Sequence, residues 1–282
     1  MCAKRLYAAT ALAACLALAT GAPAMAWSFG GKSAKPAPAA KQQTAKPDAK
    51  AAAAAPAAGQ MRKADAAERL AAERLDPLGS AAFWAREAQI DPTDTEAGLK
   101  LSQALRSIGR NEEAAQAAQT VLVTAPNNVD GLLALARARI NDNQGFFAIE
   151  PLQKAQTLKP RDWRSATLLG IALEQSQRLD EAKAAHDLAL SLEPNNPAVL
   201  ANAALFKAGQ GDRDGAEAML RRAVAQPNAT ARERQNLALV LGLQGKMAEA
   251  EKLLRQDLPP QAADENLAYL KASAHLAPQA RR

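Results

Sequence analysis

Side chains that commonly perform catalysis or hold metal ions are scarce in this chain and stand far apart. Among its 282 residues there are two histidines, His186 and His275, and two cysteines, Cys2 and Cys15. A transition-metal site needs several such ligands at short, regular spacing, and no group of Cys, His and Asp in the sequence has it. Because both cysteines lie near the start of the chain, no disulfide framework can hold the remainder together. We therefore expect neither a metal site nor a disulfide-linked core.

Patterns typical of catalysis are also missing. Residues 30–33 (Gly-Gly-Lys-Ser) weakly resemble a phosphate-binding loop, but the upstream glycine and the preceding strand of such a loop are lacking. The pair Asp180-Glu181 stands where a helix is expected to begin, and there the helix dipole favours anions, so acid–base chemistry is not its role. No serine lies in a nucleophile-elbow pattern. We predict no catalytic residue, no cofactor and no enzymatic activity.

Two residue types recur along the chain at a spacing of 34. The repeating alanines are Ala114, Ala148, Ala182, Ala216 and Ala250, and the repeating prolines are Pro92, Pro126, Pro160 and Pro194. Alanine-rich composition alone would not also place the prolines with the same period. The spacing therefore indicates structural repeats.

One repeat, residues 163–196, is predicted to form a helix, a turn and a second helix. Its first helix carries small and apolar residues on one face: Ala166, Leu169, Gly170 and Leu173. After a break near residues 176–178, the second helix carries Ala182, His186, Ala189 and Leu192 on one face. Pro194 ends that helix, and two asparagines supply the turn. We expect His186 to be a packing residue.

Small residues hold the eighth place of successive units: Ser102, Ala136, Gly170, Ala204 and Ala238. A small side chain there allows the two helices of a hairpin to approach closely, and the repeating alanine of the second helix should meet it from the other side. Ala182→Leu should overpack this contact and lower the free energy of unfolding by about 1–3 kcal/mol. A thermal melt with no change would contradict this repeat register.

This pattern resembles the tetratricopeptide-repeat (TPR) family, whose signature is Trp-x2-Leu-Gly-x2-Tyr, then Ala-x3-Phe, then Pro. Aliphatic residues replace most of the expected aromatics, in keeping with the aromatic content of 4%. The resemblance implies an all-α solenoid, a right-handed superhelix of helix-turn-helix units with a C-terminal capping helix. The predicted units span residues 61–94, 95–128, 129–162, 163–196, 197–230 and 231–258, and a capping helix and tail follow at 259–282.

Residues 1–26 are typical of a secretory signal peptide. Lys4 and Arg5 precede an apolar stretch of about 14 residues, which is shorter than the roughly 20 that a membrane-spanning helix needs. We expect cleavage after Ala26 and export to the periplasm. The alternative is that Leu12-Ala13-Ala14-Cys15 serves as a lipobox, so that Cys15 is acylated and anchors an outer-membrane lipoprotein.

Residues 27–60 are rich in Ala, Pro and Lys, and we predict a disordered linker because they cannot bury enough apolar surface to offset their ordering entropy. The formal charge of +6 lies within residues 1–60, and residues 61–282 carry no net charge. Nucleic-acid binding needs cations clustered on an ordered face. We therefore predict no nucleic-acid partner.

In a TPR superhelix the first helices line a concave groove, which suits an extended or helical peptide from a partner protein. The predicted groove residues are Glu96, Leu99, Gln103, Arg106, Asp130, Leu133, Arg137, Arg164, Thr167, Ile171, Glu174, Asn202 and Leu205. Some members grip a C-terminal carboxylate with a clamp of lysine, asparagine and arginine. Asn202, Arg232 and Asn236 stand near such places, but the preceding unit offers Thr167 and Ile171, so the clamp is incomplete.

The C-terminal third resembles a narrower family, the TadD-type proteins of tight-adherence (Flp) pilus assembly. The resemblance rests on Arg-Gln-Asn-Leu-Ala-Leu-Val-Leu-Gly-Leu-Gln-Gly at 234–245, on Ala248-Glu249-Ala250-Glu251, and on Arg-Gln-Asp-Leu-Pro at 255–259. It implies an exported scaffold whose partners are the secretin or other pilus-assembly components. An adaptor that regulates cell-wall enzymes and a chaperone-like holdase are the alternatives.

Overall fold

The computed structural model of the chain describes residues 62–276, and within them it contains 13 α-helices and no strand. The predicted all-α fold class is therefore confirmed. The signal peptide with Cys15, the linker at 27–60 and residues 277–282 lie outside the described residues. Among those described, no helix combines the length and apolar character that a bilayer-spanning segment needs.

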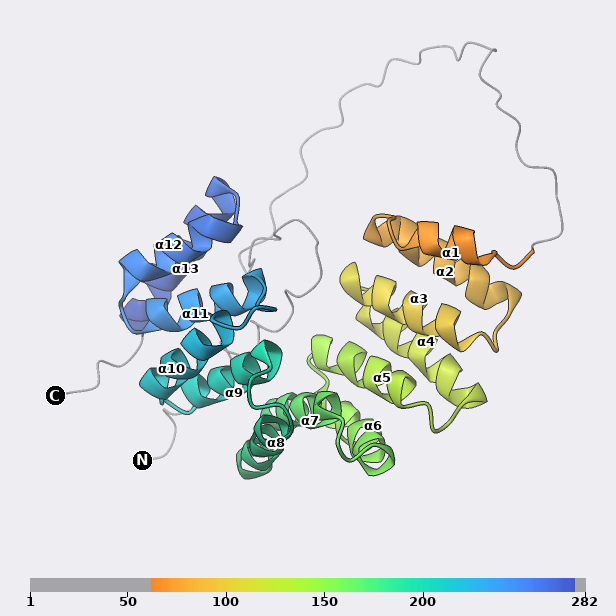
Figure 1. Cartoon of the computed structure of the whole chain (residues 1–282), viewed down its shortest axis with the longest axis horizontal. Coiled ribbons are helices and arrows are strands. Elements are labelled where there is room, and N and C mark those ends of the chain that lie inside the picture. The colour runs from red at the N-terminus through yellow and green to blue at the C-terminus, as the bar shows by residue number, and fades with distance from the viewer. Residues whose placement is uncertain (1–61, 277–282) are drawn as a thin grey trace, which may run out of the picture.

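The helices follow one another in hairpins (Figure 1). In chain order they are α1 (Ala66–Ala72), α2 (Pro77–Ile90), α3 (Thr95–Ser107), α4 (Asn111–Thr124), α5 (Val129–Asn141), α6 (Gly145–Leu158), α7 (Trp163–Gln175), α8 (Leu179–Leu192), α9 (Pro197–Gly209), α10 (Arg213–Val224), α11 (Ala231–Leu243), α12 (Met247–Asp257) and α13 (Pro260–Leu276).

Local sequence explains where the first helix of each hairpin begins. From α3 onward, the residue before that helix accepts a hydrogen bond from a backbone N–H of its first turn: Asp94, Asn128, Asp162, Asn196 and Thr230. These residues recur every 34 positions. A side-chain oxygen at the N-cap satisfies a donor that has no partner within the helix. The repeating prolines stand two residues after the ends of α2, α4, α6 and α8, where the helix has already stopped.

From the hairpin of α3 and α4 onward, the turn inside each of five successive hairpins contains one residue in the left-handed region, and this residue recurs every 34 positions. Three of these residues are glycines: Gly109, Gly211 and Gly245. The other two are Asn143 and Gln177, with φ angles of 57° and 59°. Glycine adopts this conformation without steric cost. The backbone of these hairpins therefore turns in the same way, although the residue type differs.

The two helices of a hairpin pack through the small residues. The five repeating alanines of the second helices are completely buried. Ser102 in α3 is also buried, and its hydroxyl donates a hydrogen bond of 2.8 Å to the carbonyl oxygen of Ala114 in α4. A Cβ added to Gly170 would lie 2.6 Å from the ring of His186, so the glycine accommodates the imidazole.

The stack curves because first helices pack on one another more closely than second helices do. Along the chain α3, α5, α7, α9 and α11 contact each other in succession, and each second helix packs mainly on the two first helices beside it. The first helices therefore lie on the inside of the arc in Figure 1. At the C-terminal end, α13 packs on α11 and α12 and buries Leu267 and Leu270, as a capping helix should.

Candidate functional site

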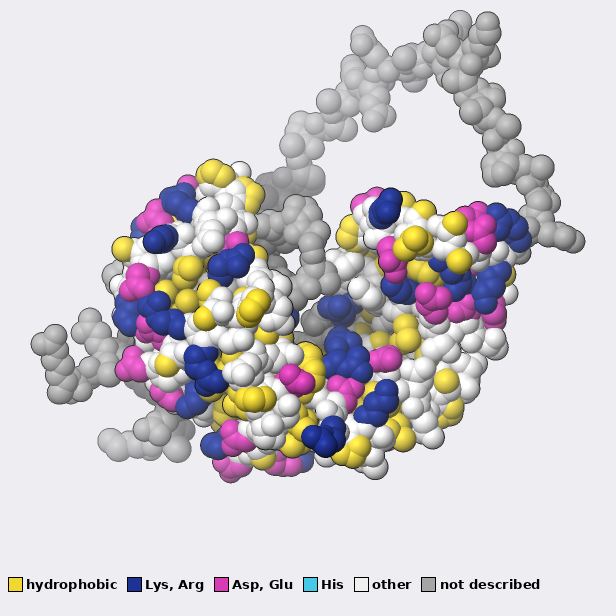
Figure 2. Space-filling view, viewed as in Figure 1, with side chains coloured by type: hydrophobic (Ala, Val, Ile, Leu, Met, Phe, Trp, Pro, Cys, Tyr) yellow, Lys and Arg dark blue, Asp and Glu magenta, His cyan; other side chains and the backbone are white. Residues whose placement is uncertain are grey.

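The concave side of the arc contains a pocket of about 200 Å³ that only first helices line. Its walls come from α3, α5, α7, α9 and α11, so five consecutive hairpins contribute to one site. The lining residues are Arg106, Arg137, Ile140, Asn141, Trp163, Arg164, Thr167, Leu168, Ile171, Ala198, Asn202 and Arg232. Figure 2 shows Lys and Arg side chains gathered in the hollow between the two arms of the arc.

Three arginines of this pocket have no partner of opposite charge. Among the described residues, the side chains of Arg106 of α3, Arg137 of α5 and Arg232 of α11 form no ion pair and no hydrogen bond. All three side chains are half-buried. Burial lowers the pKa of each of them, and the positive charge of Arg232 lowers the pKa of Arg106 further. A guanidinium stays protonated in proteins, so the pocket holds three positive charges that no ion pair neutralises, although Glu233 attracts Arg232 at longer range.

The fourth arginine, Arg164, is paired. Its guanidinium lies 2.6 Å from Asp162 and 2.9 Å from Asp130. The hydrogen bonds to Asp162 raise the pKa of Arg164 above its ordinary value. Arg164 also adds to the positive field that lowers the pKa of Arg137, which Asp130 and Asp162 offset only in part.

Two polar side chains on neighbouring helices complete the pocket. Thr167 of α7 is 4% exposed, and its hydroxyl oxygen is buried without a hydrogen-bond partner among the described residues. Asn202 of α9 donates a hydrogen bond of 2.8 Å from Nδ2 to the carbonyl oxygen of Ala198, which orients its amide. Ile140, Leu168 and Ile171 supply apolar surface. The arrangement suits a ligand that has anionic groups and some apolar surface.

The structure brings six of the predicted groove residues to this pocket: Arg106, Arg137, Arg164, Thr167, Ile171 and Asn202. Leu133 is completely buried and Leu205 nearly so, and both pack in the apolar core. The prediction that they face a ligand is corrected, because both side chains are enclosed by apolar neighbours and neither lines the pocket. Leu99 is half-buried and Gln103 is exposed, and neither lines the pocket.

The predicted acidic groove residues have partners in the chain itself. Glu96 lies 2.8 Å from Arg69, Asp130 pairs with Arg164, and Oε1 of Glu174 lies 2.6 Å from Nε2 of His186. Glu174 therefore contacts the second helix of its own hairpin. Of the incomplete clamp, Asn202 and Arg232 line the pocket, whereas Asn236 is buried and does not.

Sequence reasoning left Arg232 out of the predicted groove list. The repeat could have indicated it, because Arg232 occupies the same place in the sixth unit as the predicted groove residue Arg164 does in the fourth. Its neighbour in space, Arg106, belongs to the second unit, and only the curvature of the stack brings the two together. The described residues contain no group of three or more Cys, His, Asp and Glu side chains that could hold a metal ion.

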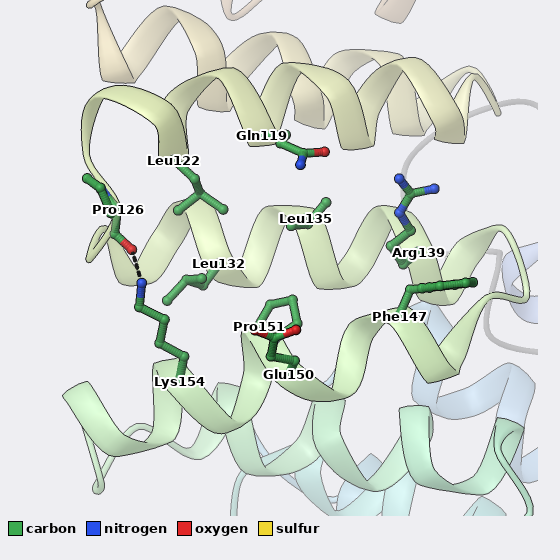
Figure 3. A pocket seen from close by; sticks show the side chains of 10 residues that line it. All are labelled: Gln119, Leu122, Pro126, Leu132, Leu135, Arg139, Phe147, Glu150, Pro151 and Lys154. Atoms are coloured by element: carbon green, nitrogen blue, oxygen red, sulfur yellow. Dashed lines mark hydrogen bonds between the residues drawn. The ribbon is translucent and has the colours of Figure 1, made fainter.

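A second hollow of about 360 Å³ lies between α4 and α6, over α5 (Figure 3). Its two cations have partners: Lys154 donates a hydrogen bond of 2.6 Å to the carbonyl oxygen of Pro126, and Arg139 lies 2.6 Å from Glu112. Phe147 at its edge is 63% exposed. This hollow therefore offers apolar contact, and each of its two cations already has a partner within the chain.

Comparison with known proteins agrees with this architecture. Residues 164–196 match the family model described as Tetratricopeptide repeat. A solved TPR protein of Thermus thermophilus, TTC0263, superposes with a TM-score of 0.57 at 25% identity, covering 64% of this chain and 99% of that chain. The chain therefore has the all-α TPR fold.

Curated relatives match over shorter shares of their length. The cellulose synthase operon protein C of Pseudomonas fluorescens (strain SBW25) is 34% identical over 132 residues, which is 46% of this chain and 10% of the relative. The mouse protein O-mannosyl-transferase TMTC1 is 24% identical over 167 residues, 58% of this chain and 18% of the relative. The chain thus spans less than a fifth of either relative.

Proposed function

Because the chain has the TPR fold, we propose that it is a scaffold that binds a segment of a partner protein in its concave groove. The observation that carries this proposal is the pocket on five first helices, with three unpaired arginines and the unpartnered hydroxyl of Thr167. If these arginines served only to stabilise the fold, we would expect them to be paired, because an unpaired half-buried charge costs free energy. A solenoid instead presents such groups along an extended surface that a peptide can follow.

The proposal also covers the cellular compartment in which the chain acts and the assembly that it serves. We propose that the chain is exported and assists assembly of a tight-adherence pilus, with the secretin or another assembly component as its partner. Support comes from the signal-like segment 1–26 and from the resemblance of the C-terminal third, at residues 234–259, to TadD-type proteins. Acylation of Cys15 would place the chain at the outer membrane, whereas cleavage after Ala26 would leave it free in the periplasm. Mass spectrometry of the mature N-terminus separates the two.

Site-specific photocrosslinking in cells tests the groove itself. A photoreactive residue at Asn141, which is half-buried and lines the pocket, should capture a partner protein. The same photoreactive residue at Lys183, which is exposed on α8, serves as the matched control and should capture the partner much less. Equal capture at both positions, or none at Asn141, would contradict binding in the groove.

A further inference from the structure

From the uncompensated charges of the concave pocket we infer that the bound segment is acidic, with at least two carboxylates that Arg106, Arg137 and Arg232 bind together. This inference rests on the proposed function and specifies the chemistry of the partner. Guanidinium groups form paired hydrogen bonds with carboxylates, and such charge-assisted bonds are stronger than neutral ones.

The position of the three arginines supports a single anionic site. Arg106 and Arg232 come from the second and sixth units, yet the two guanidinium groups are close enough for the charge of Arg232 to lower the pKa of Arg106. The positive charge of Arg106 likewise lowers the pKa of Arg137. Like charges held together in a half-buried pocket repel one another, and an anion between them would remove this repulsion.

The polar wall of the pocket gives independent support. Thr167 is buried, and its hydroxyl lies unpartnered in the lining of the same pocket, as far as the described residues are concerned. Buried polar atoms in folded proteins nearly always have a hydrogen-bond partner, so an orphan in a pocket indicates a missing acceptor or donor. A carboxylate oxygen would accept the hydrogen bond that this hydroxyl can donate.

The sign of the charge also argues that the occupant comes from another chain. Residues 27–60 of this chain carry five lysines and one aspartate, so their charge is of the wrong sign for the pocket. Residues 61–282 carry no net charge, so the cluster of arginines is not a consequence of a basic composition. The pocket is therefore a local concentration of positive charge, and a negatively charged segment of a partner would complement it.

Fluorescence polarisation with synthetic peptides tests the inference on the purified chain. The probe is a labelled ten-residue peptide with four glutamates among alanines and one leucine, compared with the same peptide carrying glutamines and with one carrying lysines. We expect the acidic peptide to bind at least about tenfold more tightly than the glutamine peptide. Binding should weaken as salt rises, because the contact is ionic.

Variants assign the binding to the pocket. Arg106→Gln, Arg137→Gln and Arg232→Gln should each weaken binding of the acidic peptide about tenfold, and the triple variant should abolish it. Arg255→Gln is the matched control, because this arginine is on the outer helix α12 and pairs with Glu251 and Asp264; it should leave binding unchanged. Circular dichroism of each variant should show the wild-type helix content.

Three results would overturn the inference. They are equal binding of acidic and glutamine peptides, equal loss with Arg255→Gln, and tighter binding of a single-stranded oligonucleotide than of the acidic peptide. None of these results would remove a partner captured from Asn141, so failure of the acidic specificity is distinguishable from failure of the proposed function.

Discussion

Nε2 of His186 lies 2.6 Å from Oε1 of Glu174, and this contact joins the second helix of the fourth unit to the end of its first helix. The imidazole is buried between Phe206, whose ring centroid is 5.1 Å away, and Gly170. Histidine therefore occupies a place where the units on either side carry Leu152 and Leu220. The ring approaches residue 170 so closely that an added Cβ would lie 2.6 Å from it, which explains a glycine where the neighbouring units carry Ala136 and Ala204.

A cycle of substitutions tests this packing. Gly170→Ala should lower the free energy of unfolding by about 1–3 kcal/mol, because the new methyl group would overlap the ring of His186. In the background His186→Leu, the same change should cost much less, because the neighbouring units already combine alanine and leucine at these two places. Urea denaturation of the four proteins measures the coupling. Equal costs in both backgrounds would show that the ring does not restrict residue 170.

The hairpin turns allow a stabilising change. Gln177 has a φ of 59°, whereas glycine stands at the equivalent place in three other turns. Gln177→Gly should raise the free energy of unfolding by up to about 1 kcal/mol, because it removes the steric cost of the left-handed conformation. Asn143→Gly is the matched comparison and should gain less, since asparagine tolerates this region. A lower melting temperature for Gln177→Gly would contradict the assignment.

Arg69 holds the first unit to the second. Its guanidinium lies 3.0 Å from the completely buried Glu87 and 2.6 Å from Asp94. Arg69→Ala should cost about 3–5 kcal/mol, because it leaves two carboxylates without their main partner. Hydrogen exchange of residues 66–90 should show the loss locally, as the units of a solenoid contact only their neighbours. Arg74→Ala should have little effect, because Arg74 is exposed and forms no ion pair within the described part of the chain.

The same network predicts a dependence on pH. Burial raises the pKa of Asp94, but hydrogen bonds from Arg69, Lys63 and the N–H of Ala97 outweigh it, and the net pKa lies well below its usual range. A carboxyl whose pKa is depressed by folding stabilises the protein above its unfolded-state pKa of about 3.9. This contribution should be complete above about pH 5 and should be lost progressively as the pH falls below about 4 towards the folded-state pKa.

Asp94→Asn should make the free energy of unfolding fall less steeply as the pH decreases. Urea denaturation between pH 3 and pH 7 should give a shallower acid limb for the variant than for the wild type. An equally steep limb in both proteins would show that other carboxylates determine the acid sensitivity.

The sequence alone determined the repeat. The fold depends on short-range features: helix propensity, N-cap residues, prolines and small residues. Each acts within one hairpin or on the next one, and the residues responsible recur every 34 positions. The all-α fold, the capping helix and the burial of small residues between paired helices could therefore be predicted from residue spacing.

Only the tertiary structure decided which first-helix side chains meet a ligand. Leu133 and Arg137 are one helical turn apart, yet Leu133 belongs to the core and Arg137 lines the pocket. The two residues lie on the same face of α5, so the difference depends on which neighbouring helices cover each turn of that face, and many weak packing contacts set this together. The meeting of Arg106 with Arg232 depends on the accumulated curvature of five hairpins, and no local pattern in the sequence encodes a distance of that kind.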